Sequence, residues 1–344
     1  MTELYGSVLF QGKRFQRLLE YRRASARHAL AEISTTAQTP WFAAFLPQDQ
    51  QLADPGTRDA MMHAIQCCVP DATLLPESIE RLWLADRADQ DAEYVVLDAR
   101  ERSQDGDRYV YDLDVRTPAG KVVERWEGLT LVAVRKRDGA GPWVPAMLGS
   151  YLERGLERVL GGSRAVVVEP AAETAGADRD RRARTGTAVG RALGRPVELR
   201  HRPDGKPELA GAPGREGWTV SASHGAGMTM AVVGRGRLAC DLETVLERTA
   251  EDWDALLGTG QLALRDLLVT EAGDGPAVAG TRVWSALECL RKAGATTQAL
   301  TLDRVHPDGW VVLSAGDATI ATWVTTVNDR TEPVVFAALA GKEN

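Results

Sequence analysis

Two acidic residues two positions apart, Asp241 and Glu243, stand in the run CDLE. On a β-strand alternate side chains leave the same face, so both carboxylates are predicted to lie side by side. Adjacent carboxylates repel each other and need a cation, and hard oxygen ligands suit Mg²⁺. Because this spacing is also common on solvated edge strands, the pair alone does not distinguish a metal site from a charged surface.

A second set of residues follows in the run WSALECLRK. On a helix, Trp284, Glu288 and Lys292 fall at i, i+4 and i+8 and line one stripe. The stripe offers an apolar anchor, a carboxylate and a cation about 6 Å apart at each step. An ordinary surface Glu–Lys pair would show the same spacing, so this run too is ambiguous by itself.

Three weaker signals precede these two runs. Ser223 and His224 end a predicted strand in the run SASHG, where a histidine could reach a phosphate or a substrate. Lys206 and Pro207 lie in the predicted turn DGKPEL. Residues 178–202 hold eight arginines against three acidic residues, which suggests a site for an anion such as a nucleotide phosphate. A turn histidine, a simple loop and a solvated helix face are the alternatives.

The elements that must position these residues indicate an α+β fold. The second half has no dinucleotide-binding glycine fingerprint and no phosphate-binding loop. Helices are predicted at 179–193, 251–257, 260–270 and 277–293. Strands are predicted at 197–200, 218–222, 228–233, 238–243, 310–314, 318–326 and 333–339.

The first half is predicted to be a helix wrapped by an antiparallel meander. The helix is expected at 58–68, and residues 18–33 carry a mixed pattern. An amphipathic helix at 147–160 ends at a Gly-Gly-Ser sequence. We therefore expect two domains, 1–160 and 164–344. Strands of the first half are predicted at 79–85, 94–102, 109–117 and 121–135.

Composition narrows the functional classes. A chain of 344 residues holds roughly two domains of about 150 residues. Its 41 basic and 48 acidic residues give a net charge of −7, which argues against general nucleic-acid binding. No run approaches the ~20 apolar residues that span a bilayer, and no apolar signal core is present, so a cytoplasmic protein without a membrane partner is expected. The four cysteines form no zinc or disulfide pattern.

The order of the motifs is more specific than any one of them. The arginine-rich helix, GKP, SxSH, DxE and WSxxExxxK follow one another within about 115 residues. This order and spacing resemble the surfactin-type 4′-phosphopantetheinyl transferases over about residues 165–344. The resemblance implies a two-lobed α+β domain that transfers 4′-phosphopantetheine from coenzyme A to a serine of an acyl carrier protein. It implies Mg²⁺ as cofactor, with coenzyme A as substrate.

The resemblance also implies roles for individual residues. Asp241, Glu243 and Glu288 would hold Mg²⁺ against the coenzyme A pyrophosphate, and Lys292 would contact phosphate; these four are the catalytic set. His224, with Ser223 beside it, would contact a coenzyme A phosphate, and Lys206 with Pro207 would lie along the adenine. An arginine of the basic helix would contact the 3′-phosphate. Arg182 is the choice for this contact, with Arg181 and Arg184 as alternatives.

The implied chemistry is the attack of a serine hydroxyl on the β-phosphate of coenzyme A, with 3′,5′-ADP leaving. Glu288 or a metal-bound water would take the serine proton, and the sequence does not separate the two. Three positions depart from the family pattern. Leu287 replaces a lysine, Cys289 replaces a small residue, and Ala239 replaces a glycine. The first change removes a cation near the site but leaves the three carboxylates intact.

The first half has a resemblance of its own. The runs YGSVLFQGKRFQ at 5–16 and DAMMH at 59–63 resemble the second hot-dog half of polyketide synthase dehydratases, with closest similarity to enediyne synthases. In those synthases a dehydratase precedes an integral phosphopantetheinyl transferase. The histidine motif of the first hot-dog half is missing, so Asp59 lacks a catalytic mate. We expect Asp59 and His63 to form a helix acid with its i+4 partner.

Three functions follow from these patterns. The first is phosphopantetheinyl transfer to a carrier protein of the same synthase. The second is a hot-dog dehydratase or thioesterase, against which the missing histidine motif argues. The third is a non-catalytic docking module with a degenerate transferase half, supported by Leu287 alone.

Overall fold

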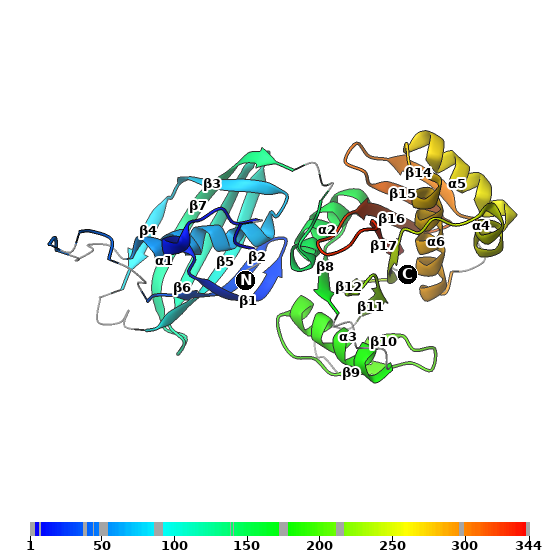
Figure 1. Ribbon diagram of the computed structural model, residues 1–344. Coiled ribbons are helices and arrows are strands. Elements are labelled where there is room, and N and C mark those ends of the chain that lie inside the picture. Colours follow the sequence, from blue (N-terminus) through cyan, green and yellow to red (C-terminus); the bar gives the residue numbers. More distant parts are fainter. Residues whose placement is uncertain are drawn as a thin grey trace. The chain divides into compact units, whose positions relative to one another are not determined.

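The structure is a computed structural model in which the chain forms two compact units, Met1–Arg137 and Asp138–Asn344. Each unit is described by itself (Figure 1). No helix among the described residues is long and apolar enough to cross a membrane. The described residues are 4–6, 8–36, 40–43, 45–47, 54–85, 92–137, 139, 141–171, 178–210, 217–295 and 299–341.

The first unit is built on one antiparallel sheet with the strand order β1-β2-β5-β6-β7-β3, and β4 also pairs with β7. Alternate residues of β6 are buried, which is the pattern of a sheet with one face in the core. The strands are β1 (Leu18–Ser25), β2 (His28–Ser34), β3 (Ala72–Ser78), β4 (Arg81–Leu84), β5 (Tyr94–Asp105), β6 (Arg108–Arg116) and β7 (Val122–Lys136).

Helix α1 (Pro55–His63) supplies the other side of this core. It begins because Asp54 caps the Thr57 amide at 2.9 Å and a proline occupies the first helical position. The predicted helix at 58–68 is confirmed, although its last turn is the 3₁₀ helix η2 (Ala64–Cys68). A second 3₁₀ turn, η1 (Lys13–Phe15), precedes β1. The unit is therefore a helix on an antiparallel sheet, as predicted.

The mixed pattern at 18–33 resolves into the paired strands β1 and β2. Register shifts occur between Leu18 and Glu20 and between Tyr21 and Arg23. Each shift changes which face the following side chains occupy, so the alternation that marks a strand is interrupted. The predictions also missed β3, whose last four residues are exposed and therefore lack an apolar pattern.

The second unit contains two larger sheets and a small hairpin. The sheet β11-β12-β8 carries α3, and the sheet β13-β17-β16-β15-β14 carries α4, α5 and α6. The strands are β8 (Arg164–Pro170), β9 (Leu199–His201), β10 (Pro207–Leu209), β11 (Trp218–Gly225), β12 (Met228–Arg235), β13 (Leu238–Thr244), β14 (Thr301–Val305), β15 (Val311–Ala315), β16 (Ala318–Thr325) and β17 (Val334–Gly341).

The helices of this unit cover the sheets with small and branched side chains. Ala188, Val189 and Ala192 of α3 pack on β12, while Ala279 and Ala286 of α6 belong to the core of the larger sheet. The second unit is thus α+β with two sheets, and its predicted likeness to a two-lobed transferase stays a prediction. The helices are α2 (Pro145–Leu160), α3 (Asp178–Leu193), α4 (Ala250–Leu257), α5 (Thr259–Glu271) and α6 (Pro276–Lys292).

The boundary between the units differs from the expected one at 160–164. The Gly-Gly-Ser sequence that follows helix α2 predicts that this helix ends the first domain. The structure instead places α2 in the second unit, where its buried leucines and Gly149 lie against β8. The carboxylate of Glu153 accepts the amide of Val166 at 2.8 Å, which ties the helix to that strand. Tertiary packing, rather than the glycine pair, therefore decides where the unit begins.

Candidate functional site

The β11–β12 hairpin positions the SASHG motif at the end of a strand. Its turn residues Ala226 and Gly227 have φ angles of 46° and 63°, and two positive φ values match the twist of a tight hairpin. His224 pairs directly with Thr229 across the hairpin. Ser223, the next residue back, leaves the opposite face of the strand.

Ser223 meets Asp241 of β13 and Lys292 of α6. The Ser223 hydroxyl donates to Asp241 Oδ1 at 2.9 Å. The Lys292 ammonium donates to Asp241 Oδ1 at 2.8 Å, to Ser223 Oγ at 3.1 Å and to the Cys240 carbonyl at 2.9 Å. Residues more than 50 positions apart therefore converge, and three of the predicted site residues form one cluster.

A serine bonded to a lysine could suggest nucleophilic catalysis, with the amine acting as a base. Burial lowers the pKa of Lys292, but the charge and hydrogen bond of Asp241 oppose this effect, and the net shift is upward. An ammonium with a raised pKa holds its proton and is a poor base at neutral pH. The Lys292 ammonium is therefore suited to binding an anionic group rather than to activating the Ser223 hydroxyl.

The carboxylates near this cluster fit a divalent cation in two respects. Asp241 is 3% exposed, and its Oδ2 is buried without a hydrogen-bond partner. Burial raises the pKa of Glu243, and the charges of Asp241 and Glu288 raise it further, against a hydrogen bond with Trp284. Three negative groups thus act on one another across β13 and α6. An orphaned oxygen and repelling carboxylates are what a bound cation would relieve.

Two of these three carboxylates are paired with basic side chains. Asp241 pairs with Lys292, and Glu288 pairs with Arg291 at 2.5 Å. Among the described residues, no three histidine, cysteine, aspartate or glutamate side chains form a group that could hold a metal ion. A cation would therefore draw ligands together that now have other partners.

His224 links the hairpin to the basic helix α3. Its Nε2 lies 3.1 Å from the Thr185 hydroxyl of α3, and its Nδ1 lies 2.9 Å from the Thr229 hydroxyl. Burial lowers its pKa to about 4, and the charges of Arg184, Arg181 and Lys292 add to the effect. The ring is therefore neutral at physiological pH.

The arginines of α3 differ in where they lie. The charges that act on His224 are those of Arg184 and Arg181, the two alternatives considered for the phosphate contact. Arg184 is half-buried, whereas Arg182, the first choice, is exposed. Of Arg184 and Arg181, Arg184 has the larger effect on the pKa of the ring. Thr185 and Thr229 were missed, because a threonine within a helix or a strand carries no functional signal by itself.

Lys206 and Pro207 lie apart from the carboxylates on the β9–β10 hairpin. Asp204 Oδ1 accepts the Lys206 amide at 3.1 Å and so stabilises the predicted turn, while Pro207 begins β10. Burial and the charge of Arg202 lower the pKa of Lys206. The structure gives no hydrogen bond or ion pair, among the described residues, between this hairpin and Asp241. Their predicted place along an adenine stays a prediction.

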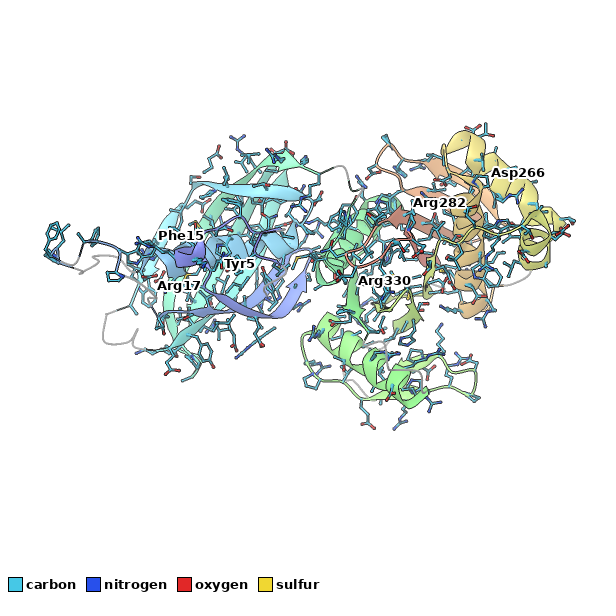
Figure 2. All side chains as sticks on the ribbon, in the orientation of Figure 1. Tyr5, Phe15, Arg17, Asp266, Arg282 and Arg330 are labelled. Carbon is cyan, nitrogen blue, oxygen red and sulfur yellow. The ribbon has the colours of Figure 1, made fainter. Side chains whose placement is uncertain are left out.

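In the first unit, Asp59 and His63 form the expected i+4 pair on α1. His63 Nδ1 lies 3.1 Å from Asp59 Oδ2, and His63 Nε2 lies 3.0 Å from the Tyr5 hydroxyl. The same hydroxyl also accepts the Leu18 amide at 3.1 Å. Tyr5 lies beside α1 in Figure 2. The hydrogen bonds from Tyr5 through His63 to Asp59 hold the carboxylate in place.

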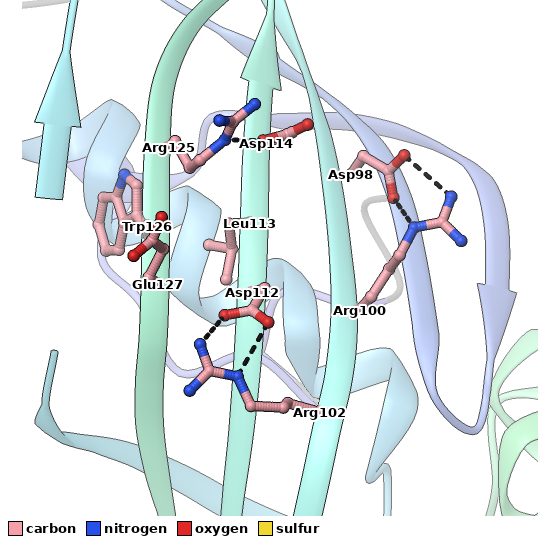
Figure 3. Close-up of a pocket in the computed structure, with 9 residues that line it drawn as sticks. All are labelled: Asp98, Arg100, Arg102, Asp112, Leu113, Asp114, Arg125, Trp126 and Glu127. Carbon is pink, nitrogen blue, oxygen red and sulfur yellow. Dashed lines mark hydrogen bonds and ion pairs between the residues drawn. The ribbon is translucent and has the colours of Figure 1, made fainter. Parts of the chain in front are cut away.

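A pocket of about 340 Å³ crosses the solvent-facing side of strands β5, β6 and β7 (Figure 3). Arg100 contacts Asp98 at 3.0 Å, and Arg102 contacts Asp112 at 2.9 Å. Burial raises the pKa of Asp98, but hydrogen bonds from His28 and Arg100 bring it down to about 2. Since these charges are directed at one another, the pocket is lined by ion pairs within β5 and between neighbouring strands.

Residues 1–140 match the family model described as "Polyketide synthase dehydratase N-terminal domain". The first unit is similar to the hot-dog domains of polyketide synthase dehydratases. This finding agrees with the resemblance drawn from YGSVLFQG and DAMMH. The description names the N-terminal domain of the dehydratase, whereas the sequence motifs pointed to the second hot-dog half, and that finer placement stays a prediction.

Solved structures with similarity to the chain include three proteins of polyketide synthesis. A trans-acyltransferase polyketide synthase enoyl-isomerase is 18% identical, with a TM-score of 0.28 over 35% of this chain and 46% of that chain. The dehydratase domain of a mycocerosic acid synthase-like synthase is 20% identical, with a TM-score of 0.29 over 36% and 43%. The RzxB dehydratase domain from Pseudomonas fluorescens is 22% identical, with a TM-score of 0.27 over 35% and 42%. The chain thus spans less than half the length of each, and a search of curated proteins found no match.

Proposed function

We propose that the second unit transfers 4′-phosphopantetheine from coenzyme A to a serine of an acyl carrier protein, with Mg²⁺ as cofactor. The observation that supports this most is the buried, unpartnered Oδ2 of Asp241 beside Glu243 and Glu288. A buried carboxylate oxygen without a hydrogen-bond partner is energetically costly, and binding a cation would lower that cost. The motif order described above supplies the substrate class.

The residues divide into an acidic side and a basic side. Asp241, Glu243 and Glu288 would hold the metal, and Lys292 with Arg184 would supply positive charge to the phosphates. When bound, the metal would neutralise the charge that develops as 3′,5′-ADP leaves. Lys292 keeps its proton because of Asp241, so it remains a cation throughout. A cation fixed before the reaction begins stabilises developing negative charge without reorganisation.

The general base follows from the same geometry. Lys292 is excluded because its pKa is raised, and His224 is occupied at both ring nitrogens. Glu288 is paired with the exposed side chain of Arg291, a contact that water screens and that an incoming protein could replace. Glu288 or a water held at the carboxylates therefore remains the acceptor of the serine proton.

The test uses the full chain with coenzyme A, Mg²⁺ and an apo acyl carrier protein. Mass spectrometry of the carrier should show a gain of about 340 Da, the mass of one phosphopantetheine group, that requires the metal. The control is the same reaction with the carrier serine changed to alanine. Absence of any mass gain with several apo carriers would refute the transferase proposal and favour a docking module.

A second function is favoured for the first unit by the family match at residues 1–140. We propose that it serves a dehydratase as one hot-dog part, with Asp59 as its catalytic acid when a histidine is supplied by another part of the synthase. Alone, it should not dehydrate a 3-hydroxyacyl carrier protein. Turnover of such a substrate by the isolated chain, lost in Asp59→Asn, would contradict this incomplete-site proposal.

A further inference from the structure

We propose that residues 141–160, which comprise helix α2 and the segment just before it, form a clamp that fixes two sheets of the second unit against each other. The two are the small sheet, β11-β12-β8, and the large sheet, β13-β17-β16-β15-β14. The proposal does not depend on the transfer reaction. It concerns any chemistry at the candidate site, because Ser223 lies on the small sheet and Asp241 on the large sheet.

One side of α2 is attached to β8, an edge strand of the small sheet. Glu153 accepts the Val166 amide at 2.8 Å, and a Cβ on Gly149 would lie 2.5 Å from the Val166 carbonyl oxygen. The guanidinium of Arg164, the first residue of β8, donates to the Leu156 carbonyl at 3.1 Å. A cation beside the last turns of a helix interacts favourably with the carbonyls there, so this bond holds the end of α2 on the strand.

Another side of α2 is attached to the large sheet. A Cβ on Gly155 would come within 2.3 Å of the Trp310 ring, so the helix and the indole approach as closely as a glycine allows. Arg158 pairs with Asp308, which like Trp310 lies in the connection between β14 and β15. Helix α2 thus contacts both β8 and β16, beside which it lies in Figure 1.

The segment before α2 adds contacts to the large sheet. The Trp143 amide donates to the Thr326 carbonyl at 3.0 Å, and the Asn328 amide donates to the Trp143 carbonyl at 2.9 Å. These bonds form a bridge to the connection between β16 and β17. The Tyr151 ring of α2 lies 4.7 Å from the Trp143 ring and 4.6 Å from the Trp323 ring of β16, measured between centroids. The segment, the helix and β16 therefore share one aromatic cluster.

The two attachments lie on opposite sides of the helix. Successive residues of an α-helix are rotated by about 100°, so Gly149 and Glu153 share one side. Tyr151, Gly155 and Arg158 share the side about 180° away by the same rotation. A helix that is fixed to a different sheet on each side holds the two sheets at a set distance and angle.

The sheets also meet directly, through β11 and β13. The Cys240 amide donates to the Ser221 hydroxyl at 2.9 Å across this contact. Since β11 and β8 are the two edges of the small sheet, α2 connects the sheets at the edge opposite to β11. Two sheets joined along one edge can rotate about it, whereas a connection at the far edge prevents that rotation. Loosening the clamp should therefore open the contact between β11 and β13 while each sheet keeps its own ladder.

The test is amide hydrogen exchange of the full chain, followed by NMR. The Cys240 amide reports on the contact between the sheets, and the amides of β12 and β16 report on the individual ladders. Tyr151→Leu loosens one side of the clamp and Glu153→Leu the other. Each should raise Cys240 exchange by about tenfold relative to the ladder amides. The double variant should exchange no faster than the faster single variant, because a clamp released on either side no longer holds.

Two control variants separate the clamp from general stability. Tyr151→Phe keeps the aromatic ring and should stay within about twofold of the wild type. Ile320→Val shortens a fully buried side chain in the core that α6 covers, so it should lower the melting temperature without a selective rise at Cys240. If Tyr151→Leu does not fold, Gly155→Ala on the same side of the helix must give the selective rise.

Three results would overturn the proposal. The first is unchanged Cys240 exchange in both clamp variants despite a lower melting temperature. The second is an equal rise at Cys240 and at the ladder amides, since α2 would then be an ordinary core helix. The third is a double variant whose rise is the product of the two single rises, because the two sides of α2 would then act independently.

Discussion

Removal of the Lys292 ammonium is the perturbation whose effect the geometry defines best. Lys292→Met keeps most of the apolar side chain but deletes three hydrogen bonds, to Asp241, Ser223 and the Cys240 carbonyl. Asp241 would lose its ion-pair partner in a site that is 3% exposed, with Oδ2 already unpartnered. Breaking a buried ion pair from one side costs about 3–5 kcal/mol of folding free energy.

For a unit of this size each kcal/mol corresponds to about 2–4 °C in melting temperature, so Lys292→Met should lower the transition of the second unit by about 6–20 °C. Differential scanning calorimetry of the full chain measures this shift. Arg291→Met is a matched control, because its side chain is adjacent in sequence, exposed and paired with Glu288. An exposed pair contributes about 0–1 kcal/mol, so this variant should shift by at most about 4 °C.

The double variant Lys292→Met with Asp241→Asn tests whether the loss of stability comes from the unpaired carboxylate or from the missing lysine side chain. Without the buried charge, most of the lost stability should return, since the penalty arises from the unpaired carboxylate rather than from the missing lysine. Lys292→Met no less stable than Arg291→Met would refute the buried-pair reasoning. A double variant that is less stable than Lys292→Met would show that the lysine acts through packing instead.

Three further outcomes are expected. Asp241→Asn should reduce Mg²⁺-dependent transfer by about 10²–10³-fold in the mass assay, and near-normal turnover would remove Asp241 from the metal site. Folding lowers the pKa of His224 from 6.5 to about 4. The contribution of the neutral ring to stability is therefore complete above pH 6.5 and is lost as the pH falls through 4. His224→Gln should flatten the pH–stability curve between pH 6.5 and 4, as measured by urea unfolding. Gly155→Ala should lower the free energy of unfolding by about 1–3 kcal/mol, because its methyl group would overlap the Trp310 ring. Gly186→Ala on α3, with nothing within 4 Å, should raise it by up to about 1 kcal/mol. Equal melting temperatures for the two variants would contradict the packing described.

Local patterns determined most of the secondary structure. The helix at 58–68, the helix at 277–293 and the strand at 238–243 were all predicted close to their observed bounds, because each carries a local pattern of apolar residues. The same periods predicted that alternate residues of β13 share a face and that residues four apart on α6 share a stripe. The similarity of the first half to dehydratases could also be predicted from the sequence, because each of its motifs is a continuous run of residues.

Tertiary structure decided what the local patterns leave open. Whether Asp241 meets Lys292 depends on the packing of α6 over β13, which no spacing within either run encodes. Which arginine of α3 is half-buried depends on how the helix is rotated on its sheet, and the closely spaced Arg181, Arg182 and Arg184 do not reveal that rotation by themselves. Thr185 meets His224 only because the β11–β12 hairpin brings the histidine to α3, 39 residues along the chain. Side-chain chemistry and period are local properties, whereas burial, partner and charge environment exist only once the chain has packed.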